Sequence, residues 1–140
     1  MILVVVSCNA QENNSTKGNT SAVMTVKQES LKNEKIREYK FLEGMYTDNY
    51  FPRNLVDKVK QILLECCLNI ERKQPQNLEE LYKLSREATE KINDLADEFA
   101  RNQSEIETGA REVIAMDFDF IARSYGFKAD VEELISNRDW

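Results

Sequence analysis

The fold is decided by one stretch of sequence, PRNLVDKVKQILLECCLNIERKQP at residues 52–75. Its apolar residues recur at intervals of three and four positions, which is the period of an α-helix. They form two adjacent stripes, Leu55, Val59, Ile62 and Cys66, and Val56, Leu63, Cys67 and Ile70. A face this wide is typical of a helix that is contacted on more than one side. Pro52 suits the first turn of this helix, and Pro75 predicts its end near residue 73.

Residues 77–102 predict a second helix with a narrower apolar stripe. Seven residues follow a spacing that alternates between three and four, namely Leu78, Leu81, Ser85, Ala88, Ile92, Leu95 and Phe99. This heptad spacing predicts one buried seam on an otherwise charged helix. The small residues Ser85 and Ala88 at its centre would allow a neighbouring helix to approach closely.

A third helix is predicted to begin at Ser104 and to end before Gly126. Ser104 and Glu107 form a capping-box pattern, in which each side chain satisfies the backbone N–H of the other residue. Glycine is the preferred residue just after the end of a helix, because it adopts the left-handed conformation easily. The apolar face of this helix consists of Ile106, Ala110, Val113, Ile114, Phe118, Ile121 and Tyr125. A short fourth helix is expected from about Asp130.

Together these patterns predict an all-α fold, an irregular bundle of four main helices with a short N-terminal helical turn at residues 41–46. The chain has 140 residues with only 4 Gly and 2 Pro, which is less turn punctuation than an all-β fold would need. A domain of this length can bury a core without disulfides or metals. We assign residues 39–140 to the helical domain and residues 1–38 to a leader.

The predicted leader consists of an apolar start and a disordered polar stretch. MILVVVSC at residues 1–8 resembles the end of a bacterial lipoprotein signal, in which Cys8 would carry the lipid. The polar stretch NAQENNSTKGNTS at residues 9–21 has the composition of a flexible tether. A complete signal also needs a basic start and a longer apolar run. Either the signal is completed upstream, which makes the protein a membrane-anchored envelope lipoprotein, or the apolar start is accidental and the protein is cytoplasmic.

Charge and composition exclude several classes of function. The net charge is −6 overall and +2 over residues 1–40, which leaves −8 on residues 41–140. An acidic domain repels nucleic acid, whereas a basic protein partner is compatible with it. The chain has no His, which excludes His-dependent catalytic triads and His-containing metal sites. No cofactor or metal site is predicted, and no segment reaches the roughly 20 apolar residues of a membrane-spanning helix.

Asp117 is the sharpest anomaly in the sequence, because it falls in the middle of the apolar arc of the third helix. A charged carboxylate left alone in such a place costs several kcal/mol. It either accepts hydrogen bonds from Ser85, Thr89 or an Arg, or it serves as an acid in a pocket of the bundle. The first interpretation is favoured. Cys66 and Cys67 are likewise interpreted as small buried apolar residues rather than as a redox pair.

Residues 46–53 form an aromatic loop, and the chain ends in a Trp. The candidate interaction surface consists of Tyr46, Asp48, Tyr50, Phe51, Arg53 and Trp140. Tyr, Phe, Trp and Arg are enriched at protein interfaces, which indicates a partner-binding loop. Aromatic residues before a helix also cap small cores, and this interpretation is favoured. For Trp140, docking onto the bundle is favoured over anchoring a partner.

Three stretches resemble an uncharacterised bacterial family of small acidic helical proteins, a domain of unknown function. They are FLEGMYTDNYFPRNLVDKVKQILLE at residues 41–65, SEIETGAREVIAMDF at 104–118, and YGF at 125–127 followed by EELISNRDW at 132–140. The resemblance covers about residues 39–140. It implies a helical fold and assigns no catalytic or binding residue.

Our leading hypothesis is a non-catalytic protein-interaction module of the binding, inhibitor or immunity type. The acidic domain, the aromatic loop and the lack of a recognisable reaction centre favour it. Two alternatives stay open. One is a carboxylate-based enzyme or a ligand-binding helical bundle centred near Asp117, and the other is a structural envelope lipoprotein.

Overall fold

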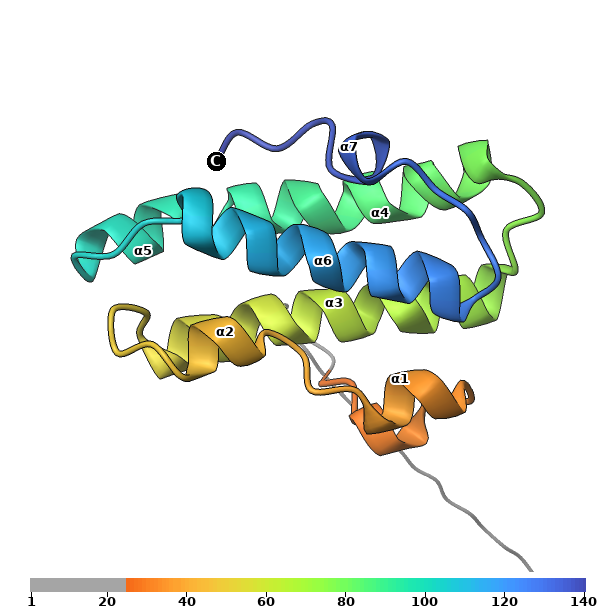
Figure 1. Ribbon diagram of the computed structural model, residues 1–140, viewed down its shortest axis with the longest axis horizontal. Helices are drawn as coiled ribbons and strands as arrows, with labels where there is room; N and C mark the ends of the chain where they lie inside the picture. Colours follow the sequence, from red (N-terminus) through yellow and green to blue (C-terminus); the bar gives the residue numbers. More distant parts are fainter. Residues whose placement is uncertain (1–24) are drawn as a thin grey trace, which may run out of the picture.

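A computed structural model describes residues 25–140, so Cys8 and the greater part of the predicted leader lie outside the described residues. The elements are η1 (Gln28–Ser30), α1 (Glu34–Glu38), α2 (Glu43–Tyr46), α3 (Arg53–Lys73), α4 (Leu78–Asn93), α5 (Ala96–Arg101), α6 (Thr108–Ser124) and α7 (Val131–Leu134). All regular elements within residues 25–140 are helical, which confirms the predicted all-α bundle. α3, α4 and α6 run side by side, α2 and α7 pack against them, and α5 continues from the end of α4 (Figure 1).

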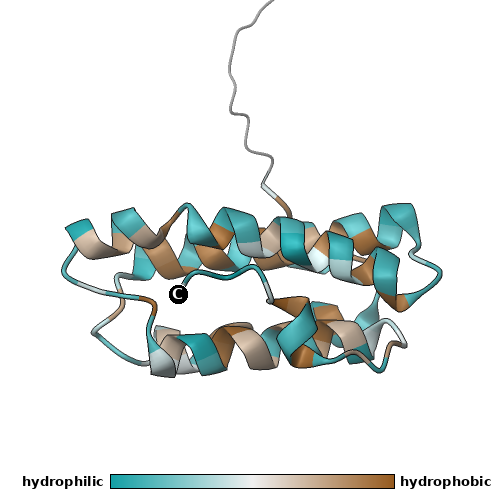
Figure 2. Cartoon of the chain, turned by 90° about the horizontal axis from the view of Figure 1, so that it is seen from above, coloured by the Kyte–Doolittle hydropathy of each residue, from teal (hydrophilic) through white to brown (hydrophobic). Residues whose placement is uncertain are grey.

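α3 has more buried residues than any other helix within residues 25–140, as its two apolar stripes predict. Its buried residues are Leu55, Val56, Val59, Leu63, Leu64, Cys66, Cys67 and Ile70. α4 packs along one side of it, and α2 lies against its first half (Figure 1). Gln74 ends the helix in the left-handed conformation (φ 49°), with its N–H donating to the Ile70 carbonyl at 2.9 Å. Seen from above, hydrophilic residues predominate on the outer sides of the helices (Figure 2).

The predicted single helix over residues 77–102 is wrong, because the structure divides it into α4 and α5. At the break the Leu95 N–H donates to the Ile92 carbonyl at 2.9 Å, a bond one residue shorter than that of an α-helix. Asn93 and Asp94 precede the break, and both are weak helix formers. The Asn93 side chain instead bonds the Asn137 carbonyl at 3.0 Å and the Asp139 N–H at 3.1 Å. The tighter turn still leaves Phe99 fully buried.

The predicted capping box of the third helix is also wrong. α6 begins at Thr108, and Glu107 makes no capping hydrogen bond with its side chain. The reason lies in the end of α5, where the Ser104 N–H bonds the Phe99 carbonyl and the Gln103 N–H bonds the Ala100 carbonyl. With Gln103 left-handed (φ 61°), this is a Schellman motif. Ser104 therefore closes α5 instead of opening α6.

Residues 25–38 pack on the bundle, ahead of the predicted domain boundary at residue 39. Val26, Leu31 and Ile36 are buried in the core. Gln61 of α3 pairs with both backbone groups of Val26, at 2.8 Å to its N–H and 3.1 Å to its carbonyl oxygen. The polar composition of this segment concealed its role, because its three buried residues are spaced five apart among charged ones.

The Glu71 carboxylate fastens this N-terminal segment to the bundle. It accepts hydrogen bonds from the Lys32 N–H at 2.9 Å, the Asn33 N–H at 3.0 Å and the Tyr125 hydroxyl at 2.6 Å. The Asn33 side chain continues the contact by donating to the Ser124 carbonyl at 2.8 Å. One acidic side chain of α3 thus joins residues 32–33 to the end of α6.

Glu71→Gln is expected to lower the free energy of unfolding by about 1–3 kcal/mol, because it replaces charge-assisted bonds and leaves donors without an acceptor. Urea denaturation measures the loss, and amide hydrogen exchange at Lys32 and Asn33 should become faster. Glu112→Gln, at an exposed position beyond the first turn of α6, is the matched control and should change neither. Equal stability of the two variants would contradict the role given to Glu71.

Candidate functional site

Asp117 lies in the middle of α6 with only 3% of its surface exposed. Its Oδ1 accepts a hydrogen bond from the Tyr39 hydroxyl, and its Oδ2 accepts one from the Leu42 N–H, both at 2.7 Å. Neither Ser85 nor Thr89 is its partner, because their hydroxyls donate to the Leu134 carbonyl (2.8 Å) and the Ser85 carbonyl (3.0 Å). The carboxylate therefore binds the segment between α1 and α2.

That segment turns sharply over α6. Leu42 adopts the left-handed conformation (φ 57°), uncommon for a branched residue, which turns its N–H towards Asp117. The Tyr39 ring stacks on Phe120, with ring centroids 3.8 Å apart. A Cβ atom at Gly44 would lie 3.0 Å from Val113 Cγ2, so glycine permits the close contact of α2 with α6. No sequence pattern indicated these partners of Asp117, because they are far from it along the chain.

Burial raises the pKa of Asp117 to about 6, although the hydrogen bonds from Tyr39 and Leu42 act in the opposite direction. Burial and the adjacent Asp117 together raise the pKa of the Tyr39 hydroxyl. The acid form of Asp117 can keep both contacts, because one oxygen still accepts from Leu42 while the other donates to the Tyr39 hydroxyl. The group can therefore change its charge without losing its partners.

The raised pKa of Asp117 predicts a pH dependence of stability. Because ionisation is harder in the folded state, the free energy of unfolding should fall as pH rises from about 4 to about 6 and level off above that. The contribution is on the order of 3 kcal/mol. Urea denaturation of the native protein and of Asp117→Asn across this range should give a difference with this slope. A difference that does not vary with pH would contradict the assignment.

A groove opens beside Asp117, between residues 38–44 and α6. It has a volume of about 550 Å³ and is lined by Glu38, Tyr39, Lys40, Glu43, Gly44, Val113, Met116 and Asp117. Met116 is 67% exposed. The groove thus combines an apolar wall with three carboxylates and one ammonium group.

The aromatic loop is held by its own polar contacts. The Tyr46 hydroxyl donates to Asp57 at 2.5 Å, and the Arg53 guanidinium lies 5.3 Å from the centre of the Tyr46 ring. Asp48 accepts a hydrogen bond from the Tyr50 N–H at 2.9 Å. Tyr46 and Phe51 are half-buried against the core, whereas Asp48, Tyr50 and Arg53 are exposed. The loop therefore both caps the core and presents residues to solvent.

Tyr50 is the exposed aromatic residue of this loop, with 43% of its surface accessible. Its ring meets Phe51 edge to face at 5.0 Å between centroids, and its hydroxyl lies 3.4 Å from Glu107 Oε2. Glu107 precedes the first turn of α6. These contacts hold the Tyr50 ring at the end of the bundle where α6 begins.

Trp140 lies near the same helix end. It is half-buried against the core, and its carbonyl oxygen accepts a hydrogen bond from Arg111 Nε at 3.2 Å. Arg111 follows Glu107 by one helical turn, so the aromatic loop and the C-terminus both contact the start of α6. The sequence favoured docking over partner binding for Trp140, and the structure has it packed on the bundle.

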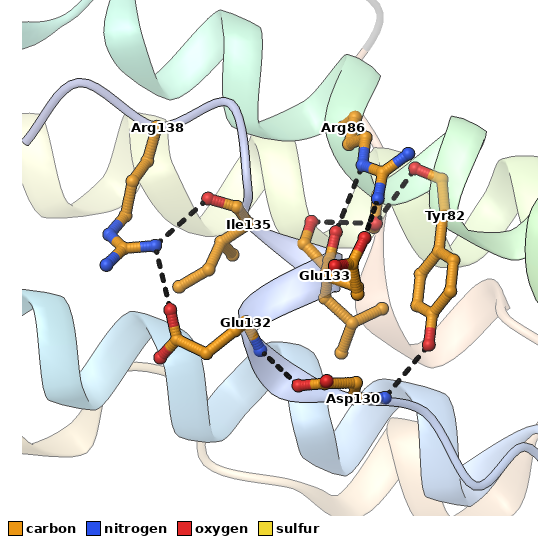
Figure 3. Close-up of polar contacts among 9 residues, drawn as sticks. Tyr82, Arg86, Asp130, Glu132, Glu133, Ile135 and Arg138 are labelled. Carbon is orange, nitrogen blue, oxygen red and sulfur yellow. Dashed lines mark hydrogen bonds and ion pairs between the residues drawn. The ribbon is translucent and has the colours of Figure 1, made fainter.

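A polar cluster that the sequence analysis missed fastens the segment leading to Trp140 (Figure 3). Arg86 of α4 binds Glu133 twice, through the carboxylate at 2.5 Å and the carbonyl at 3.0 Å. The Tyr82 hydroxyl accepts a hydrogen bond from the Asp130 N–H at 3.0 Å. Arg138 donates to the Ile135 carbonyl at 3.2 Å. No short-range pattern signals the contacts of Arg86 and Tyr82, because they join residues nearly 50 positions apart.

Cys66 and Cys67 are buried and free. Burial raises the pKa of the Cys66 thiol to about 12 and that of Cys67 well above its ordinary value. Thiols kept neutral in this way react slowly. Over residues 25–140 we find no group of three acidic, Cys or His residues that could hold a metal ion.

In a Cys8→Ser variant, the remaining two thiols should label at least about 100-fold more slowly in the native protein than in urea, because labelling requires opening of the core. Timed alkylation followed by mass spectrometry measures both rates. Comparable rates would show that the thiols are accessible in the native state and would reopen a redox role.

None of the helices within residues 25–140 has the length and apolar character needed to cross a membrane. Fold and contacts define a small helical domain in which the buried side chains of Ser85, Thr89 and Asp117 form hydrogen bonds within the same chain. Residues 35–140 match a family described as a family of unknown function, DUF5713, and the chain belongs to this family. The resemblance noted from the sequence is confirmed to that extent. The chain matches no curated protein and no solved structure.

Proposed function

We propose that this protein is a non-catalytic interaction module that binds a partner protein through its aromatic loop, residues 46–53. The observation that carries the proposal is the exposure of Tyr50 in a loop that is otherwise fixed by contacts. A partner gains more from an aromatic side chain that is already held in place, because little conformational entropy is lost on binding. Tyr and Arg are also the residues that most often dominate the binding energy of interfaces.

The surroundings of the loop indicate the charge of the partner. Asp48 lies within the loop, and Asp57 lies on the first turns of α3. Glu105 and Glu107 lie across from Tyr50. The guanidinium of Arg53 lies over the ring of Tyr46. Together with the net charge of −8 over residues 41–140, this favours a partner with a basic surface. Small acidic helical proteins of the inhibitor or immunity type are the nearest analogy.

A carboxylate enzyme at Asp117 is not part of the proposal, because both hydrogen bonds of Asp117 fasten the segment between α1 and α2, which is a structural role. A bacterial envelope location with a lipid on Cys8 is compatible with an interaction module and belongs to the proposal. Mass spectrometry of the protein from its native host would detect the lipid. A purely structural lipoprotein would differ by having no partner that depends on the loop.

Affinity capture from the native host with the full-length protein and with Tyr50→Ala tests the proposal. We expect a stoichiometric basic protein whose recovery falls by at least about tenfold with Tyr50→Ala, the loss typical of a central interface residue. Leu78→Ala on α4, which removes another exposed apolar side chain, is the matched control and should retain the partner. Unchanged thermal stability would show that Tyr50→Ala acts on binding. Equal recovery by native protein and Tyr50→Ala would refute the loop as the binding surface.

A further inference from the structure

The groove beside Asp117 has a chemistry of its own, separate from the aromatic loop. We propose that it binds a small organic cation, a primary ammonium group on a short apolar stem. The ammonium would face Asp117, and the stem would lie along Val113 and Met116. This site does not depend on the interaction proposed for the loop.

Asp117 is a buried carboxylate without a counter-ion among the described residues. Acidic residues as buried as Asp117 are normally paired with a cation. None of the ion pairs within the described part of the chain includes it, and its two partners are the neutral donors Tyr39 and Leu42. A carboxylate can accept about four hydrogen bonds, so Asp117 retains the capacity to accept from an ammonium group.

The charged residues that line the groove are predominantly acidic. Glu38 comes from the end of α1 and Glu43 from the start of α2, and with Asp117 they outnumber Lys40 by three to one. Arg123 of α6 lies near Tyr39, but its charge is paired with Asp119 at 2.9 Å. On the side of α3, Asp117 contributes to the raised pKa of the Cys67 thiol, which burial keeps neutral. The balance favours a cation and disfavours an anion.

One wall of the groove is apolar. Gly44, Val113 and Met116 line the side of the groove formed by α2 and α6. Met116 is the most exposed large apolar side chain of residues 25–140, and covering it would remove apolar surface from water. The volume of about 550 Å³ lies in the range of sites for small molecules. A charged head with an apolar stem complements both halves of the groove.

Titration of the full-length protein with hexylammonium chloride tests the proposal, with 1-hexanol as a neutral probe of matched length. In ¹H–¹⁵N spectra we expect saturable shifts at Lys40, Gly44 and Met116, and binding of hexanol at least about fivefold weaker. Lowering the pH from about 7.5 to about 5 should weaken the binding of hexylammonium, because Asp117 becomes neutral while the probe keeps its charge. Glu38 and Glu43 are the other acidic residues that line the groove.

Variants separate these contributions. Asp117→Asn should weaken hexylammonium binding at least about fivefold and should reduce its pH dependence, because residue 117 then has no charge to lose. Lys40→Gln should tighten binding by removing a competing cation. Glu112→Gln, an exposed position on α6 outside the groove, is the control for loss of one charge and should change affinity less than about twofold. If Asp117→Asn is too unstable to measure, Lys40→Gln and the pH series on the native protein decide the question.

Equal binding of hexylammonium and hexanol would overturn the proposal, because the carboxylate would then contribute nothing. Shifts spread evenly over the acidic surface, or equal effects of Lys40→Gln and Glu112→Gln, would overturn it as well. Saturable shifts confined to the groove, with opposite effects of the Asp117 and Lys40 variants, would support it.

Discussion

Everything in this fold depends on burying both apolar stripes of α3. One neighbouring helix can bury a single apolar stripe. The buried residues of α3, among them Val59, Leu63 and Cys67, cover a wider part of its circumference and need more than one neighbour. α4 covers one side, and α2 and the N-terminal segment pack against other parts of it. Packing therefore sets the positions at which the polar residues meet.

Two buried or half-buried carboxylates then fix the path of the N-terminal segment. Glu71 of α3 holds residues 32–33, and Asp117 of α6 holds residues 39–42. Both accept hydrogen bonds from backbone N–H groups that have no partner within a helix. Without these acceptors, the unpaired N–H groups would lower the stability of the irregular segment. Between these two points the chain has little freedom, and the groove beside Asp117 takes its shape from that restriction. The candidate sites of this protein are consequences of how a short irregular segment is fastened.

Much of the fold could be predicted from sequence, because α3, α4 and α6 express their burial through helical periodicity. The failures have local physical causes. The capping pattern at Ser104 was overridden by the Schellman motif of α5, and the heptad seam continued in sequence through a break at Asp94 and Leu95. The burial of residue 117 followed from its position on the helix. Its partners did not, because Tyr39 and Leu42 are joined to it only by the tertiary fold.

The contact between Asn33 and Ser124 has a consequence for the order of assembly. The two residues are 91 positions apart, and a ribosome makes residue 33 long before residue 124. The N-terminal segment cannot settle until the end of α6 has emerged, so the part of the domain that is synthesised first is bound last. During that interval Leu31 and Ile36 have no complete surface to cover them. In this chain, residues 31–36 therefore lack their final contacts until the end of α6 has been synthesised.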